Sequence, residues 1–213
     1  MPPSRAWRRR SIPPNDMQRI IRDTVFAALD FESAGAAPGM TDAPVQTGIA
    51  QMRGTAILPN TFIRTYINPR RAVTWAAQKV HGITSAQLAS APLMTSLWPE
   101  FRACLSGNVI VAHGAGTEKR FLRAFPLHGF GPWLDTVTLA RRAWPGLADY
   151  SLEALAGVLG LRAELDVLCP GLRFHDALYD AAGSLLVLRT LITTAALEDR
   201  DLQELMPPGP LHR

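Results

Sequence analysis

The order of apolar and polar positions predicts a β-sheet that begins near the start of the chain. Residues 24–32 (TVFAALDFE) are apolar at successive positions until the last three, which is typical of a central strand covered on both faces. Residues 45–53 and 62–67 alternate well enough to predict two further strands. Residues 54–60 between them contain glycine, proline and asparagine and are expected to form a turn.

Further along the chain, short apolar runs alternate with helical patterns. Residues 109–112 predict a short buried strand, and residues 133–136 predict the last strand. Helices are expected over residues 84–105, in pieces broken at Pro92 and Pro99, and over residues 117–125, 137–144, 151–159 and 177–194. Strands that first form a meander and then alternate with helices indicate an α/β domain with a mixed sheet.

Proline-rich ends mark the expected edges of a single domain. We expect a flexible basic tail over residues 1–16, one domain over residues 17–205 and a C-terminal tail over residues 206–213. Of the 213 residues, 47% are hydrophobic and 19% are charged, which excludes a disordered chain. The longest uncharged apolar runs are well short of the roughly 20 residues that a membrane-spanning helix needs, so no membrane partner is expected.

The net charge of +4 lies entirely in the first ten residues. They contain Arg5, Arg8, Arg9 and Arg10 and no acid, and removing these four from the 22 Lys and Arg leaves 18 against 18 Asp and Glu. The rest of the chain is therefore neutral overall. Strong phosphate binding would need a local site or a bound cation rather than a broad basic surface.

The two cysteines favour a reducing compartment. Cys104 and Cys169 are far apart in sequence and form neither a CxxC pair nor a disulfide framework, which favours a cytoplasmic location. Residues 11–16 follow the arginines without an apolar stretch, so an export signal is not expected. The arginine-rich start leaves mitochondrial import open.

Four acidic residues are expected to converge above the sheet. Asp30 and Glu32 are two residues apart at the end of the first strand, so their side chains leave the same face. Glu118 and Asp180 each lie on the apolar side of a predicted helix. Singly, each acid has an ordinary explanation: an exposed strand end, a helix N-terminal acid or a hydrogen-bonded buried acid. Together they fit a site for two hard divalent cations such as Mg²⁺ or Mn²⁺.

Two histidines compete for a role beside these acids. His113 lies five residues before Glu118, and His175 lies five residues before Asp180, so spacing alone does not choose between them. His113 ends a buried strand and fits a hydrogen-bonded core histidine, whereas His175 lies in a loop before the last helix, where a base can approach a substrate. His81 is most simply a turn residue.

The motifs that contain these residues resemble the DEDD superfamily of 3′→5′ exonucleases, in its branch with a histidine base. This branch includes proofreading subunits of bacterial replicative DNA polymerases, ribonuclease T and oligoribonuclease. The resemblance rests on residues 29–35 (LDFESAG), 111–122 (VAHGAGTEKRFL) and 175–180 (HDALYD), and on lesser matches at residues 67–69, 81–84, 91–92, 133–136 and 139–141. It implies a ribonuclease H-like fold, with a five-stranded mixed sheet flanked by helices.

The resemblance also implies a reaction. Phosphodiester bonds at the 3′ ends of nucleic acid, with single-stranded DNA expected before RNA, would be hydrolysed by a two-metal mechanism to nucleoside 5′-monophosphates. Two Mg²⁺ or Mn²⁺ ions would be held by Asp30, Glu32, Glu118 and Asp180, and His175 would accept the proton of the attacking water. A DNA polymerase is a candidate partner.

The sequence departs from the family pattern at two motifs. Glu118 stands where the family has Asp, and Gly114 stands where it has Asn. In the first motif, Ser33 and Ala34 replace two threonines. The longer Glu118 side chain keeps the alternatives of a catalytically impaired nucleic-acid-binding module and of a non-catalytic polymerase-docking domain open.

Overall fold

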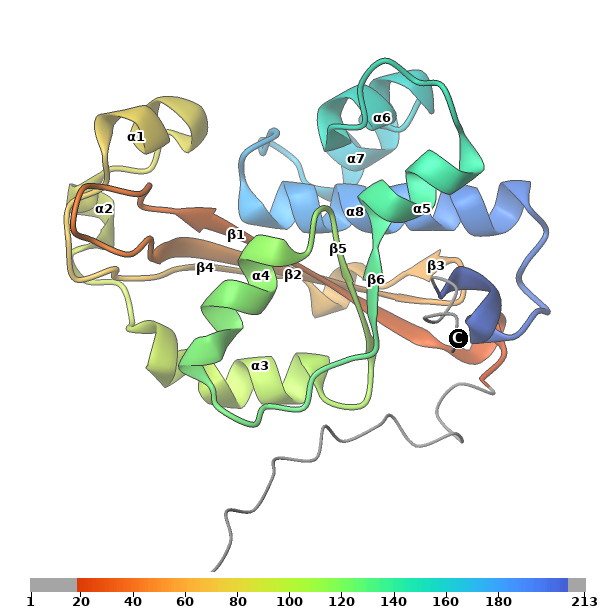
Figure 1. Cartoon of the computed structure of the whole chain (residues 1–213), viewed down its shortest axis with the longest axis horizontal. Coiled ribbons are helices and arrows are strands. Elements are labelled where there is room, and N and C mark those ends of the chain that lie inside the picture. The colour runs from red at the N-terminus through yellow and green to blue at the C-terminus, as the bar shows by residue number, and fades with distance from the viewer. Residues whose placement is uncertain (1–18, 207–213) are drawn as a thin grey trace, which may run out of the picture.

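The computed structural model describes residues 19–206 as one mixed sheet with helices on both faces (Figure 1). The predicted tails, residues 1–16 and 206–213, lie outside the described residues apart from Met206. The strands are β1 (Val25–Ser33), β2 (Pro44–Arg53), β3 (Ala56–Ile57), β4 (Ile63–Tyr66), β5 (Val109–Ala112) and β6 (Trp133–Asp135). Within the described residues, no helix is long and apolar enough to cross a lipid bilayer.

The sheet has the order β3-β2-β1-β5-β6, and β4 also pairs with β2. β1 is antiparallel to β2 and parallel to β5, so the sheet is mixed as predicted. The described residues form six strands where five were expected, because the short β3 lies within residues 54–60, which were predicted as a turn, and pairs with β2 as β4 does. A 3₁₀ turn at Pro59–Thr61 separates these two short strands.

The α-helices are α1 (Trp75–His81), α2 (Ser85–Leu88), α3 (Trp98–Leu105), α4 (Gly116–Phe121), α5 (Thr136–Ala143), α6 (Leu152–Val158), α7 (Arg162–Leu168) and α8 (Ala177–Thr194). The sequence analysis did not predict α1 and α7. Pro99 lies in the first turn of α3, where it starts the helix rather than breaking it. His81 is the last residue of α1 and not a turn residue, since Gly82 caps that helix in a left-handed conformation.

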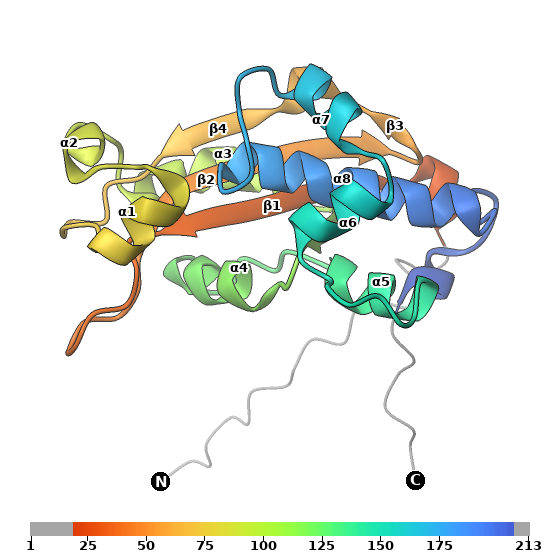
Figure 2. The ribbon, with the colours of Figure 1, turned by 90° about the horizontal axis from the view of Figure 1, so that it is seen from above.

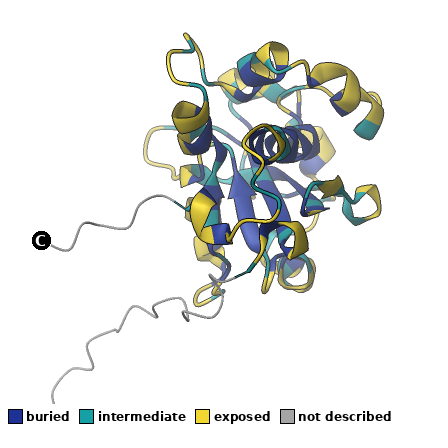
Figure 3. Ribbon diagram, turned by 90° about the vertical axis from the view of Figure 1, so that its right-hand side faces the viewer, coloured by how far each residue is buried: buried dark blue, intermediate teal, exposed yellow. Residues whose placement is uncertain are grey.

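The two faces of β1 contribute to two different hydrophobic cores. Phe26 and Ala28 pack in the core formed with α8, while Leu29 and Phe31 pack in the core that contains Phe101 and other aromatic side chains. Figure 2 shows α8 lying along the sheet, and Figure 3 shows that it is buried almost all round. The alternation of β1 therefore directs its even-numbered positions, including 30 and 32, toward α8.

Candidate active site

The four predicted acids come from three elements that meet at the carboxyl end of β1. Asp30 and Glu32 continue the α8-facing row of β1. Asp180 lies in the first turn of α8, and Glu118 lies in the first turn of α4. Glu118 is 4% exposed, so the expectation that it points inward is confirmed.

A glycine lets α8 approach the sheet beside these acids. Gly48 of β2 is paired with Asp30 on one side and with Arg64 of β4 on the other. A Cβ atom at Gly48 would lie 2.1 Å from the carbonyl carbon of Ala177, the first residue of α8. The missing side chain therefore creates the space in which the first turn of α8 lies between Asp30 and Arg64.

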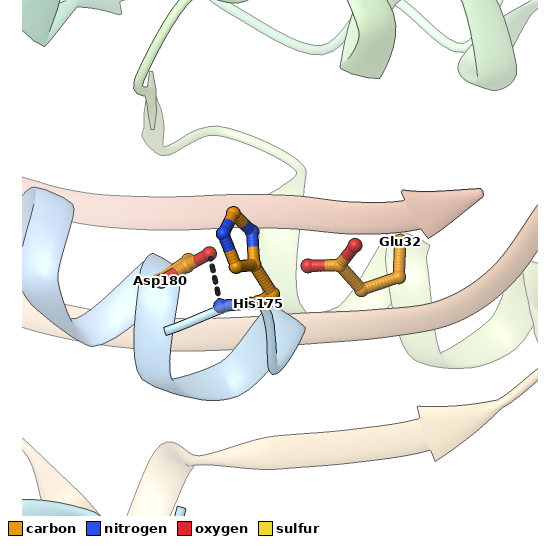
Figure 4. Close-up of side chains that lie close together, drawn as sticks. All are labelled: Glu32, His175 and Asp180. Atoms are coloured by element: carbon orange, nitrogen blue, oxygen red, sulfur yellow. Dashed lines mark hydrogen bonds between the residues drawn. The ribbon is translucent and has the colours of Figure 1, made fainter. Parts of the chain in front are cut away.

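The loop before α8 places His175 against two of the acids. Its backbone has a φ of +67°, a left-handed conformation that is uncommon for a residue other than glycine. Its amide donates a hydrogen bond to Asp180 Oδ2 at 3.1 Å. Figure 4 shows the imidazole between the carboxylates of Asp180 and Glu32, and ligand atoms of the three residues all lie within 4.8 Å of one another. Asp30 and Glu118 do not belong to this closest group.

Crowding of like charges dominates the electrostatics of the site. Burial raises the pKa of Asp30 well above its usual value, and the negative charges of Asp180, Glu118 and Glu32 raise it further. Burial raises the pKa of Glu32 to about 7, with added repulsion from Asp176 and Glu118. Burial likewise raises the pKa values of Glu118 and Asp180 to about 7 each. Neutral pH therefore leaves a cluster of carboxylates without enough positive charge to balance it.

Two carboxylate oxygens at this cluster have no hydrogen-bond partner. Glu118 Oε2 and Asp180 Oδ1 are buried and unpaired within the described residues. A buried carboxylate oxygen normally has a partner, because the loss of hydration is otherwise uncompensated. Hard divalent cations prefer a set of carboxylate oxygens of this kind, so the residues present fit the metal site expected from the sequence.

Three cavities adjoin His175. One of about 250 Å³ is bounded by Asp30, Asp180 and the start of α6 at Ser151 and Leu152. A second, of about 480 Å³, lies toward α1 and α7 and includes Lys79, Arg162 and Arg173 together with the acids Glu153 and Asp166. A third, of about 290 Å³, is bounded by Arg64, His81 and Asp176. A carboxylate cluster with basic side chains nearby is an arrangement suited to a cation-assisted site for a phosphate-bearing chain.

The geometry separates the two competing histidines. His113 uses both ring nitrogens, with Nδ1 2.8 Å from Thr136 Oγ1 and Nε2 2.8 Å from the carbonyl oxygen of Tyr150. Burial lowers its pKa, so the neutral form, with Nε2–H donating to Tyr150, fits these contacts. The imidazole of the exposed His175 makes no hydrogen bond to any other described residue. His113 therefore joins the start of α5 to the loop before α6, and of the two histidines that line the 250 Å³ cavity, His175 is the one whose ring nitrogens are not used by the fold.

Several supporting residues were not anticipated. Asp176 caps α8 through a hydrogen bond from the amide of Leu178, and an aspartate directly before an apolar helix is a signal that could have predicted this. Asp135 accepts hydrogen bonds from the amides of Gly114 and Ala115 and so shapes the loop before Glu118. His81 contacts the carbonyl oxygen of Ser33 at the end of β1. These last contacts join residues distant in sequence, and no local pattern shows them.

Similarity to known proteins extends over this site. Residues 27–188, about three quarters of the chain, match the family RNase_T, described as an exonuclease. The chain is 32% identical over 181 residues to DNA polymerase III PolC-type from Thermotoga maritima, covering 78% of this chain and 12% of the relative. It is 29% identical over 154 residues to exodeoxyribonuclease 10 from Escherichia coli K12, covering 71% of this chain and 65% of the relative. The chain thus spans less than two thirds of either curated relative.

A solved structure shares the fold. Exonuclease X in complex with 5′ overhanging duplex DNA is matched over 84% of this chain and 98% of that chain, with a TM-score of 0.69 and 26% sequence identity. This likeness confirms the ribonuclease H-like α/β fold expected from the motifs. The matched residues 27–188 include the ends of β1 and β5, the start of α4 and the first turns of α8, where the four acids and His175 lie. The chain is therefore a member of the exonuclease family.

Proposed function

We propose that the protein is a metal-dependent 3′→5′ exonuclease that removes nucleoside 5′-monophosphates from the 3′ ends of DNA. The observation that carries the proposal is the convergence of four carboxylates, two with unpaired oxygens, beside the accessible His175. Family membership supports the reaction class. The names of the similar proteins, which refer to DNA polymerase and exodeoxyribonuclease, support DNA before RNA.

Asp30, Glu32, Glu118 and Asp180 are the proposed ligands for two Mg²⁺ or Mn²⁺ ions. Their oxygens are the hard donors that these cations prefer. The raised pKa values, caused by burial and mutual repulsion, support a site in which a cation would favour the ionised carboxylates. When bound, the cations would supply the positive charge that stabilises the negative charge developing on the phosphoryl oxygens. Glu118 reaches further than the usual Asp, and its buried, unpaired Oε2 supports a ligand role rather than a surface role.

His175 is the proposed general base. Its imidazole is exposed, lies beside Glu32 and Asp180, and lines all three cavities described above. A neutral ring nitrogen there can accept the proton of a water molecule that attacks the terminal phosphodiester. The basic side chains of Lys79, Arg162 and Arg173 lie where the phosphates of the strand would pass.

The partners and location remain part of the same proposal. The similarity to a PolC-type polymerase supports a replicative DNA polymerase as a partner. Cys104 and Cys169 are both free thiols, which supports a cytoplasmic location. The predicted single domain at residues 17–205 would be the exonuclease domain.

The test is digestion of end-labelled oligonucleotides, DNA and RNA, single- and double-stranded, with Mg²⁺ and with EDTA. We expect shortening from the 3′ end with release of 5′-monophosphates, only with the cation present. An Asp30→Asn variant prepared in parallel controls for contaminating nucleases. Activity in excess chelator, or degradation from the 5′ end, would contradict the proposal. Metal-dependent strand binding without hydrolysis would favour the impaired binding module instead.

A further inference from the structure

A polar cluster on the sheet holds the loop that carries His175. Asp176 is 9% exposed and lies between His175 and the start of α8. Its Oδ2 accepts hydrogen bonds from Arg64 Nε at 2.7 Å and from Gln46 Nε2 at 3.0 Å, and it forms an ion pair with Arg64 Nη2 at 2.6 Å. Arg64 thus uses two nitrogens on one oxygen, a geometry that fixes direction as well as charge.

Gln46 connects the same cluster to the helix itself. It is fully buried on β2, where it is paired with Glu32 of β1. Its Oε1 accepts a hydrogen bond from the amide of Ala177 at 2.9 Å, while its Nε2 donates to Asp176. Both polar ends of Gln46 are therefore used on consecutive residues that directly follow His175.

The sheet register explains why Arg64 can reach this loop. Asp30, Gly48 and Arg64 are direct partners across β1, β2 and β4, and side chains of direct partners leave the same face of a sheet. Because Gly48 has no side chain, the start of α8 lies between the acids on one side and Arg64 on the other. Arg64 contacts the N-terminal cap of α8 from outside the acidic cluster.

The His175 backbone needs such support. A left-handed φ in a residue other than glycine costs free energy and persists only where neighbouring contacts hold it. The flanking Asp176 is held by three side-chain and backbone partners. On the other flank, Phe174 is held by ring contacts with Tyr179 and Arg162, so the polar contacts of the loop gather at Asp176.

We propose that Arg64 is a positioning residue, which sets the orientation of the general base His175 through its ion pair with Asp176. The inference rests on the proposed function, in which His175 is the base. Arg64 does not touch the reacting atoms; its side chain is 36% exposed at the edge of the site. Loss of Arg64 would release Asp176 and with it the backbone that aims the imidazole between Glu32 and Asp180.

The first measurement is kinetic. We expect Arg64→Ala to lower kcat about 10- to 100-fold with little change in KM, because small displacements of a catalytic group have effects of this order. Arg64→Lys should recover part of the rate, since one ammonium cannot reproduce the two-nitrogen contact. Arg22→Ala removes an arginine–aspartate ion pair of the same short range, to Asp199, at an exposed position away from the site, and serves as the control for the loss of one arginine.

A double-mutant cycle separates positioning from general stability. In a His175→Ala background there is no base left to orient, so Arg64→Ala should cause little further loss of kcat. An equal fold-loss in both backgrounds would overturn the proposal. A rise in KM at constant kcat would also overturn it, because Arg64 would then act on substrate binding.

A readout independent of activity is cleavage by trypsin after Arg173, in the loop before His175. We expect faster cleavage at this bond in Arg64→Ala and in Asp176→Asn than in the wild type or Arg22→Ala, at matched melting temperatures. Unchanged cleavage would overturn the positioning role. If cleavage accelerates while the wild-type protein has no nuclease activity, the loop contact stands and the proposed function fails, so the two failures are distinguishable.

Discussion

The backbone of Ala177 occupies the space that a side chain at Gly48 would need. A Cβ atom at Gly48 would lie within 2.2 Å of three backbone atoms of residues 177 and 178, none of which can rotate away. The approach of α8 to β2, and hence the position of Asp180 over β1, depends on this one missing side chain.

We therefore expect Gly48→Ala to be severely destabilising, by about 3 kcal/mol or more, because overpacking against backbone cannot be relieved by a change of rotamer. Urea unfolding would measure it. Gly116→Ala is the matched control: a Cβ there meets no atom within 4 Å, and alanine has the higher helix propensity. Equal stabilities for the two variants would show that α8 does not lie against Gly48 as described.

The raised carboxylate pKa values predict a stability that falls with pH when no metal is bound. An acid whose folded pKa lies above its unfolded value contributes stability at low pH that is lost as pH rises toward the folded pKa. For Glu32, Glu118 and Asp180 this window runs from about pH 4 to about pH 7. In EDTA at pH 8, the melting temperature should therefore be lower than it would be if these three carboxyls kept their ordinary pKa values.

Divalent cations should reverse that loss. A cation present at about 100 times its Kd adds about 2.7 kcal/mol, or roughly 5 to 10 °C in melting temperature for a chain of this size. The gain should be larger at pH 8 than at pH 5, where protons compete for the same oxygens. Calorimetry at both pH values, with Mg²⁺ and with EDTA, measures it; a gain that is independent of pH would argue against the carboxylates as ligands.

Alanine substitutions of the two histidines should have different effects, one on the rate and the other on stability. We expect His175→Ala to lower kcat by about 10² or more while the melting temperature and the stabilisation by Mg²⁺ largely survive. His113→Ala should instead lower stability by about 1–3 kcal/mol, because it leaves Thr136 and Tyr150 without a partner. A folded, inactive His113 variant together with an active His175 variant would reverse the assignment.

Glu118 should show opposite effects on activity and on metal-free stability. Glu118→Gln removes a buried charge that has too few partners, so in EDTA at pH 8 it should raise stability by up to about 3 kcal/mol. The same change should nearly abolish hydrolysis, since the charge that offsets a cation is lost. Glu118→Asp should leave a measurable fraction of the rate.

The competing view makes Glu118 an acid that only favours the start of a helix. Glutamine would then cost about 0.3 to 1 kcal/mol and leave the rate unchanged. Rates and melting temperatures across a Mg²⁺ titration decide between the two. A fully active Gln variant with unshifted metal dependence would remove Glu118 from the site.

Strong periodicity made some elements predictable from sequence. α8 begins and ends at the predicted residues, because its apolar run is long and is preceded by an aspartate cap. α1 was missed because none of its residues is buried, and α7 because Leu165 alone among its residues is buried, so neither has an apolar stripe. The predicted strand at residues 62–67 is β4, whereas the two-residue β3 was missed because it lies within residues 54–60, whose glycine, proline and asparagine favour a turn.

The four acids of the candidate site could be predicted from the sequence, whereas the residues that position the site could not. Asp30, Glu32, Glu118 and Asp180 stand out because a carboxylate in an apolar pattern needs a reason to be there. The Arg64–Asp176 contact joins residues 112 positions apart, and only the sheet register brings them together. The choice between His113 and His175 likewise required the contacts of both rings, and the spacing of residues along the sequence gives no information about these contacts.

The alternation of β1 makes the length of this strand as important as its composition. Chemistry and core packing are interleaved residue by residue, with Asp30 and Glu32 on one face and Leu29 and Phe31 on the other. Deleting a single residue upstream within the strand would turn the carboxylates into the aromatic core and Phe31 toward α8. Insertions are harmless only beyond Ser33, where the largely exposed loop of residues 36–43 leaves the sheet. Redesign of this protein can therefore vary the exposed residues 38–41, while Asp42 is kept for its ion pairs with Arg71 and Arg120 and β1 keeps its length.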